Sequence, residues 1–461
     1  MKAKKVLSVL LAVTLTVMLA ACGSGQSQEV APKAEGGAAG SQEEQPGEKK
    51  PAGQENASDE DKVITFWNIA TEDPDKAIMN YAVDQFNQNS SSGYQTEVVA
   101  VQNDNYKEKL IIAMSSGECP DMYTSWTGGP MIEYIESGFA QPLDDLFYKS
   151  DLPNRLTEGS IAQGTYNGHI YAIPVNNVSV TGIFYNKEIF DKYNLQVPET
   201  IGQLESVCDT LLGNGITPFA LANQEKWTGS QYFMYLATRY GGLDAFTSAA
   251  DGTGSFEDEC FIKAGETIKN WVKKGYFPEG VNSLSWNDGM AKQLFYQENA
   301  AMMLTGSGMS SVFMNDSEEF FNKLGWFPFP VAEGVDTDPT LMIGTMGDQF
   351  ISFNCTGEKL EAAFECVTNY STPEGAQFMV DKGKIPPVKG IEEKVSNPLL
   401  KTVIEYANKA SNVQLYYDQY LPPAVAQVHL NTMQEVFGLT MEPAEAAKQM
   451  QKANQDYLAE K

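Results

Sequence analysis

The chain has 461 residues, of which 42% are hydrophobic and 11% aromatic, and its formal net charge is −28 at pH 7. This acidity disfavours binding to nucleic acid or to an anionic membrane face, because both attract basic patches. The chain has two histidines, and its six cysteines form no CxxC pair, so we expect no metal site, no cofactor and no disulfide framework.

The first 21 residues have the order of a bacterial export signal peptide. Lysines near the N-terminus precede an apolar run from Val6 to Ala21, which is short of the roughly 20 apolar residues of a membrane span. The run ends in LAAC at Cys22 and resembles the lipobox of bacterial lipoproteins, which implies cleavage before Cys22 and lipidation of its thiol. The alternative is an ordinary secretory leader with a chance cysteine.

Residues 22–61 are predicted to form a lipidated cysteine followed by a tether. Beyond Cys22 this segment is rich in Gly, Ala, Ser, Gln, Glu and Pro, with very few large apolar side chains. Such a composition cannot bury enough surface to offset its conformational entropy, so we expect disorder.

Strand-like and helix-like segments alternate from residue 62 onward. Extended, β-branched runs at 62–69, 94–101 and 120–126 alternate with helix-spaced runs at 77–89, 105–117 and 129–138. A similar alternation begins near residue 182, with Thr200 as the predicted cap of one helix and the glycine pair at 241–242 as the predicted end of another. This order predicts an α/β fold with a mainly parallel sheet, and the roughly 400 residues after the tether favour two lobes.

One region carries a specific pattern, YNGHIYAIPVNNVSVTGIFYNKEIFDKYNLQVPET at residues 166–200. It resembles the signature of family 1 extracellular solute-binding proteins, the maltose- and oligosaccharide-binding components of ABC importers. The matching residues are Tyr166, Gly168, Tyr171, Ala172, Pro174, Tyr185, Asn186, Lys187, Phe190, Pro198 and Thr200. Segments upstream at 120–146 and downstream at 295–308, 325–331 and 439–457 resemble further landmarks of that family in the same order.

The resemblance implies a two-lobed, periplasmic-binding-protein-like clamp (type II) with a ligand cleft between the lobes. The N-terminal lobe would comprise 62–176 plus 332–371, and the C-terminal lobe 177–331 plus 372–461. The implied function is to capture a carbohydrate, favouring an oligosaccharide, and deliver it to an ABC permease. The protein would be a monomer without enzymatic activity, lipid-anchored on the extracellular face of a Gram-positive bacterium. Since the sequence has no P-loop string, the ATPase would be a separate partner.

Sugar binding requires aromatic rings that pack on the C–H face of a pyranose and polar groups that pair with its hydroxyls. Loop placement and the resemblance together predict ligand contacts at Trp227, Trp126, Trp67, Trp286, Ser179, Asn176, Asn177, Asp418, Asp348, Glu72 and one of Tyr416, Tyr417 and Tyr420. Each has a structural alternative, such as core packing for the aromatics and solvation for the acids. Relatives often carry a tryptophan where this chain has Met309, so one stacking surface is missing and maltose itself is put in doubt.

Two other functions remain open from the sequence alone. The abundance of carboxylates would allow an exported glycosidase or lyase, although the sequence cannot pair an acid with a base. The cleft could also bind a different solute, such as a glycosaminoglycan fragment, a polyol phosphate or a peptide.

Overall fold

The computed structural model describes residues 62–461. The predicted signal peptide (1–21) and the lipidated Cys22 with its tether (22–61) lie outside the described residues. Within the described part, no helix combines the length and apolar character needed to cross a bilayer.

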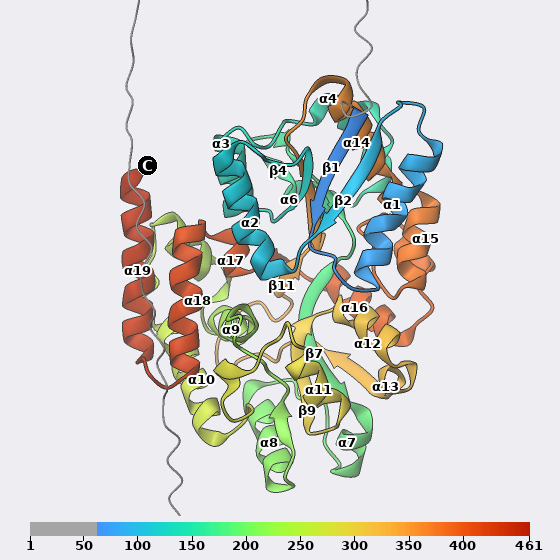
Figure 1. The fold of residues 1–461 in the computed structure, drawn as a ribbon. Coiled ribbons are helices and arrows are strands. Elements are labelled where there is room, and N and C mark those ends of the chain that lie inside the picture. The colour runs from blue at the N-terminus through green and yellow to red at the C-terminus, as the bar shows by residue number, and fades with distance from the viewer. Residues whose placement is uncertain (1–61) are drawn as a thin grey trace, which may run out of the picture. The chain divides into compact units, whose positions relative to one another are not determined.

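The first sheet has the strand order β2-β1-β3-β12-β6 (Figure 1). Its strands are β1 (Val63–Asn68), β2 (Gln95–Ala100), β3 (Met122–Ser125), β6 (Ala172–Val175) and β12 (Gln349–Phe353). β1 runs parallel to β2 and β3, as the predicted β-α-β-α order requires, whereas β12 runs antiparallel to β3 and β6. The sheet is therefore mixed and not mainly parallel, because β12 runs antiparallel to both of its neighbours.

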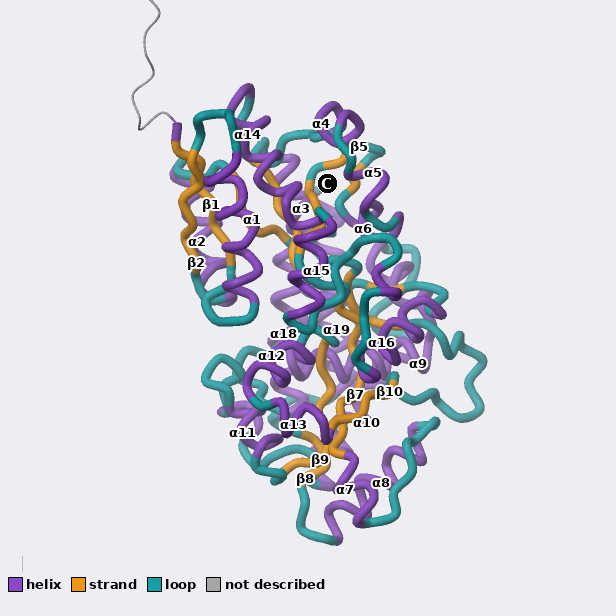
Figure 2. Tube along the Cα trace, turned by 90° about the vertical axis from the view of Figure 1, so that its right-hand side faces the viewer, coloured by secondary structure: helices purple, strands orange, loops and turns teal. Residues whose placement is uncertain are grey.

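The second sheet has the order β13-β11-β7-β9-β8, with β10 also pairing with β7. Its strands are β7 (Ser179–Asn186), β8 (Thr217–Phe219), β9 (Ala300–Gly306), β10 (Leu324–Phe327), β11 (Met342–Thr345) and β13 (Val413–Gln414). A separate hairpin joins β4 (Thr165–Tyr166) to β5 (His169–Ile170). The two sheets lie in different parts of the body, and we call these parts the first and second lobes (Figures 1 and 2).

Helices pack on both sheets. Those before β7 are α1 (Asp75–Asn89), α2 (Asn103–Ser116), α3 (Gly129–Glu136), α4 (Asp144–Lys149), α5 (Leu152–Arg155) and α6 (Glu158–Gln163). Those between β7 and β11 are α7 (Lys187–Lys192), α8 (Ile201–Gly213), α9 (Trp227–Asp251), α10 (Glu259–Lys274), α11 (Met290–Tyr296), α12 (Met309–Asp316) and α13 (Glu318–Lys323). The last are α14 (Gly357–Thr368), α15 (Pro373–Asp381), α16 (Pro398–Lys409), α17 (Tyr417–Tyr420), α18 (Pro423–Phe437) and α19 (Pro443–Glu460).

Alternation along β1 explains how the first sheet is covered on two faces. Ile64 and Phe66 are fully buried on one face, in the same apolar cluster as α1. Trp67 points to the other face and packs against a second cluster that contains Tyr106 and Leu110 of α2. This arrangement fixes α2 beside the carboxyl ends of β1 and β3, where the loops of a parallel sheet form binding sites.

The chain passes between the lobes later than the resemblance implied. β11 pairs with β7, so the return to the first sheet lies between Thr345 and Gln349, not near residue 332. α15 also stays with the first lobe beyond the predicted boundary at 371, because Phe378 stacks on Tyr81 of α1 with a centroid distance of 4.7 Å. The helix predicted to end at the glycine pair does so, because Gly242 has the non-helical dihedral angles φ 74° and ψ −176°. A second helical segment follows directly and ends at Asp251, and the label α9 covers both segments.

Candidate functional site

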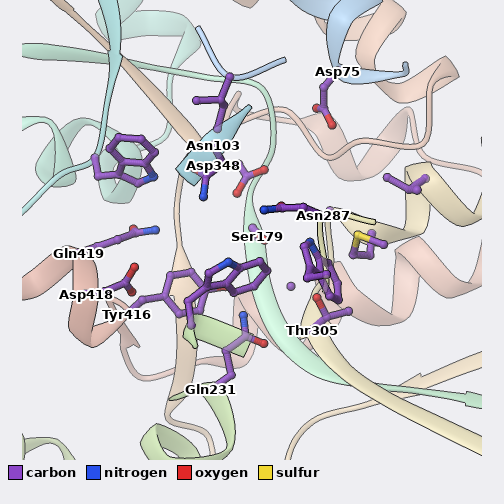
Figure 3. A pocket seen from close by; sticks show the side chains of 18 of the residues that line it. Asp75, Asn103, Ser179, Gln231, Asn287, Thr305, Asp348, Tyr416, Asp418 and Gln419 are labelled. Atoms are coloured by element: carbon purple, nitrogen blue, oxygen red, sulfur yellow. The ribbon is translucent and has the colours of Figure 1, made fainter. Parts of the chain in front are cut away.

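A cavity of about 280 Å³ is lined by residues of both lobes (Figure 3). The first lobe contributes residues at the ends of β1 and β3 and on α1 and α2: Ile69, Asp75, Asn103, Lys107 and Trp126. The second lobe contributes Trp227, Gln231, Trp286, Asn287, Thr305, Gly306, Gly308, Met309, Val312, Tyr416, Asp418 and Gln419. Ser179, Asp348 and Lys384, from segments near the passages between the lobes, complete the lining.

Three tryptophans form aromatic walls of this cavity. Trp126 follows β3 directly, Trp227 is the first residue of α9, and Trp286 lies in the turn before α11. Trp227 and Trp286 meet edge to face, with ring centroids 5.1 Å apart. The Glu225 carboxylate fixes the turn, because it accepts hydrogen bonds from the Trp286 backbone N–H at 2.8 Å and from the Ser285 hydroxyl at 2.7 Å.

Two polar atoms on one face of α9 are buried without a hydrogen-bond partner among the described residues. They are Nε1 of Trp227, a donor, and Oε1 of Gln231, an acceptor. The two residues are four positions apart in the same helix and therefore lie on the same side. Leaving such a group buried and unpaired costs about 1–3 kcal/mol, so a ligand that offers both an acceptor and a donor here would remove a penalty that the free protein carries.

Charged groups form another part of the lining. The Lys384 ammonium, which is 2% exposed, lies 2.9 Å from Oδ1 of Asp75, and the Asn176 amide donates to the same oxygen at 2.8 Å. Burial raises the pKa of the Asp348 carboxyl to about 6, although the positive charge of Lys384 opposes the shift. A Cβ built on Gly308 would lie 3.6 Å from Oδ2 of Asp348 and 3.7 Å from Nζ of Lys384. Glycine at this position therefore leaves both charged groups uncovered.

Tyr416 packs against β7, the strand that begins at Ser179. Its hydroxyl is 2.8 Å from Oγ1 of Thr181, and burial raises its pKa. Both Ser179 and Tyr416 line the cavity. They offer hydroxyl groups that can act as donor or acceptor.

Contacts between the lobes lie at the edge of the cavity. The Asn287 amide donates to Oδ2 of Asp104 at 2.8 Å, and Nζ of Lys107 lies 3.6 Å from Oδ2 of Asp418. The start of α3 also approaches α17 so closely that a Cβ on Gly129 would clash with the backbone of Leu421. The structure therefore has the lobes in contact around the cavity.

The predicted site residues divide into two groups. Those that line the cavity are Trp227, Trp126, Trp286, Ser179, Asp418, Asp348 and, of the three tyrosines, Tyr416. Glu72 lines a neighbouring cavity of about 520 Å³. For all of these residues, contact with a ligand stays a prediction.

The other predicted residues lie elsewhere. Trp67 is half-buried between strand and helix, with Nζ of Lys109 4.4 Å from its ring centroid. Asn176 and Asn177 are fully buried, and the Asn177 side chain bonds to the backbone of Val178 and Ile385. Tyr417 is in the second-lobe core and stacks on Phe246 at 3.9 Å, while Tyr420 is 40% exposed outside the cavity lining.

Sequence reasoning missed several lining residues. Gln231 follows Trp227 by one helical turn, so the helix period could have found it once Trp227 was chosen. Lys384, Asn287 and Lys107 carry no local signal, because their partners are far away in the sequence.

The histidine and cysteine side chains of residues 62–461 lie outside the cavity lining. Within 62–461, no group of three or more His, Cys, Asp or Glu side chains has the arrangement of a metal site. The cysteines described there are unpaired, and Cys208, Cys355 and Cys366 are buried. His429 is also buried, which lowers its pKa to about 3, and its Nε2 pairs with the Ser230 hydroxyl at 2.6 Å.

Comparison with known proteins gives a consistent result. The family model for bacterial extracellular solute-binding proteins matches residues 70–377. Relatives include an uncharacterised ABC transporter extracellular-binding protein of Pyrococcus horikoshii, 29% identical over 65% of this chain, and the multiple sugar-binding protein of Streptococcus mutans, 26% identical over 62%. These two alignments span 66% of each relative, just under two thirds of its length.

A solved structure extends the similarity to most of the body. It comes from work on xylan utilisation by Caldanaerobius polysaccharolyticus and is 30% identical to this chain. The alignment has a TM-score of 0.76 and covers 85% of this chain and 99% of that structure. The agreement therefore includes the arrangement of both lobes.

Proposed function

The chain belongs to the family of bacterial extracellular solute-binding proteins, and on this premise we propose that it captures a neutral oligosaccharide for an ABC importer. The ligand would bind in the cavity between the lobes and pass unaltered to a permease. The name of the Streptococcus mutans relative and the xylan context of the Caldanaerobius structure support a carbohydrate as the ligand class.

The observation that carries this proposal is that polar atoms without a hydrogen-bond partner among the described residues belong to the same cavity lining as three tryptophan rings. Nε1 of Trp227 and Oε1 of Gln231 offer one donor and one acceptor on the same face of α9. A sugar hydroxyl is both a donor and an acceptor, so neighbouring hydroxyls can satisfy the two atoms together. The rings of Trp126 and Trp286 supply apolar surface for the C–H face of a pyranose.

The charges of the lining favour a neutral ligand over an anionic one. Asp75 pairs with Lys384, and Asp418 pairs with Lys107, which leaves the Asp348 carboxylate without an ion-pair partner within 4 Å among the described residues. An anionic ligand would face this carboxylate in a partly desolvated cavity, where like charges repel strongly. A hydroxyl would instead donate to it.

Binding would work by lobe closure. Because the lining comes from both lobes, a bound sugar would contact both and stabilise the closed arrangement over an open one. The contacts between Asn287 and Asp104 and between Lys107 and Asp418 would add to the closed form. Closure would present the permease with a surface that the open protein lacks.

Lipidation of Cys22 would hold the protein on the extracellular face of the cell membrane, next to a permease with a separate ATPase. The order of lysines, apolar run and LAAC supports this part of the proposal. Stable anchoring needs more than one acyl chain, as a diacylglyceryl cysteine provides. Metabolic labelling with palmitate should mark the wild-type protein and not Cys22→Ser, which should be released into the medium. Equal retention of the two would refute the anchor.

Calorimetry and thermal unfolding with a panel of neutral oligosaccharides test the capture of sugar. A ligand at 100 times its Kd should stabilise the protein by about 2.7 kcal/mol. If only anionic solutes or peptides raise the melting temperature, a carbohydrate is the wrong ligand class. The raised pKa of Asp348 also suits a general acid, so the same samples should be assayed for new reducing ends. Turnover at ordinary enzyme rates would favour a hydrolase instead.

A further inference from the structure

The central cavity has a neighbouring cavity at each of two ends. One, of about 500 Å³, lies between α2, α3 and α18 and shares Lys107, Trp126, Trp227, Asn287 and Asp418 with the central cavity. The other, of about 520 Å³, lies between the loop after β1 and helices α11 and α12. It shares Ile69, Asp75, Asn103, Trp286, Asn287, Met309 and Val312 with the central cavity. A linear ligand longer than the central cavity has to extend into one of these two spaces.

The end toward the 500 Å³ cavity is crossed by a polar bridge between the lobes. The Lys107 ammonium lies 4.8 Å from the ring centroid of Trp126 and 3.6 Å from Oδ2 of Asp418. Trp126 belongs to the first lobe and Asp418 to the second, so the lysine side chain spans the passage. Asp104, one turn before Lys107 on the same face of α2, makes the second bridge to Asn287.

The end toward the 520 Å³ cavity differs in its chemistry. Ile69 and Asn103 face it from the first lobe, and Met309 and Val312 from the second. No hydrogen bond or ion pair between described residues joins Ile69 or Asn103 to either of the latter two. This passage is bordered by the apolar Ile69, Met309 and Val312 and by the polar Asp75, Asn103 and Asn287, and no ion pair between described residues joins any two of these six.

From this asymmetry, and resting on the proposed function, we infer that the Lys107–Asp418 ion pair is the end wall of the sugar site. One terminus of a linear oligosaccharide is enclosed against Lys107 and Trp126. The other terminus leaves between Met309 and Val312 and stays accessible to solvent. The ligand is thus a linear glycan recognised at one end, and Lys107 determines which end can carry a substituent.

Oligosaccharides blocked at a single end test this inference. Xylotetraose, chitotetraose and maltotetraose are compared by calorimetry, and the best ligand is then measured with a 2-aminobenzamide label at the reducing end or a 4-O-benzyl ether at the non-reducing end. The wild-type protein should tolerate one modification and lose affinity by about tenfold or more with the other. Lys107→Ala should recover about tenfold of that loss, because it removes one partly exposed ion pair and one cation–π contact from the passage.

Lys109→Ala is the matched control, since Lys109 is on the same helix and also lies over a tryptophan ring, but outside the cavity lining. It should leave the pattern of the two modified ligands unchanged. Equal tolerance or equal loss for both modifications, or no recovery in Lys107→Ala, would overturn the inference while leaving sugar capture intact.

A second measurement needs no sugar. It uses a Trp67→Phe background, so that Lys109 no longer covers a tryptophan. Without ligand, acrylamide quenching of tryptophan fluorescence should increase when Lys107→Ala is added to this background and not when Lys109→Ala is added, because the open passage exposes Trp126 and Trp227. Unchanged quenching contradicts the end wall directly. If none of the three tetrasaccharides binds but quenching increases, the wall stands and the choice of a sugar ligand is what fails.

Discussion

Truncation of Trp227 is the sharpest perturbation of the proposed site. Its ring is half-buried, lines the cavity and meets Trp286 edge to face, and its Nε1 has no partner among the described residues. Trp227→Ala removes both the apolar surface and the donor. Aromatic anchors at the centre of a site cost about 2–3 kcal/mol when truncated, so affinity should fall by roughly 30- to 150-fold.

Trp227→Phe separates the two contributions. It keeps an aromatic face but loses the N–H donor, and one hydrogen bond is worth about 1 kcal/mol net. Affinity should therefore fall by only about fivefold. If the phenylalanine variant loses as much as the alanine variant, the donor and not the ring carries the binding.

The fold should survive these changes. Loss of the edge-to-face pair with Trp286 costs about 1 kcal/mol beyond the apolar area that the ring buries. Because the ring is only half-buried, the total stays below the roughly 5–15 kcal/mol that stabilises a domain. Circular dichroism and thermal unfolding check this point for each variant. Tyr148→Ala, at an exposed aromatic outside the cavity, serves as the control. Calorimetry that finds wild-type affinity in Trp227→Ala would refute the reasoning.

Three further predictions concern the charged residues Asp348 and Lys384 of the cavity lining and the contact between the lobes at Gly129. The folded pKa of Asp348, about 6, exceeds its usual 3.8. The native state therefore binds the extra proton between these values, and wild-type stability should fall relative to Asp348→Asn by up to about 3 kcal/mol from pH 4 to pH 7. Urea unfolding of both proteins at both pH values measures this change. A difference in unfolding free energy that is the same at pH 4 and pH 7 would contradict the raised pKa of Asp348. Lys384→Met leaves the Asp75 carboxylate without its ion pair and should destabilise by about 3 kcal/mol, whereas a loss below about 0.5 kcal/mol in the same assay would show that the pair contributes little. Gly129→Ala should push α3 off Leu421 and weaken sugar binding by about tenfold, while Gly213→Ala, which meets nothing within 4 Å, should bind normally; equal affinities would mean that this contact does not govern closure.

Local features of the fold could be predicted from the sequence because their causes are local. Thr200 caps α8 as predicted, with its hydroxyl accepting from the Gln203 backbone N–H at 3.2 Å. The glycine pair at 241–242 was a sound local signal for a chain break, and the backbone does bend there. The helix nevertheless resumes, because Phe246 and Ala249 beyond the kink are buried in the second-lobe core. The glycine pair therefore ends the first helical segment, and tertiary packing accounts for the second segment that follows it.

The cavity required the tertiary structure. Tyr416 precedes α17 with φ −56° and ψ 144°, and Tyr417 is the first residue of that helix. Both rings are buried in the second-lobe core, but only Tyr416 lines the cavity, and no sequence pattern separates the two. Lys384 could not be predicted for another reason: its ion-pair partner, Asp75, is more than 300 positions away in the sequence. The tryptophans were accessible to sequence reasoning because each follows a strand or precedes a helix at a loop. That placement predicted Trp126 and Trp227 in the lining but also favoured Trp67, whose ring turns toward α2.

A crystal structure of the protein with its best-binding oligosaccharide is the most direct test of this account. We expect a sugar ring between Trp126, Trp227 and Trp286, with hydroxyls bonded to Nε1 of Trp227 and Oε1 of Gln231 and one end of the chain against Lys107. Sugar density on another surface, or a ring that leaves both of those atoms unpaired, would contradict it.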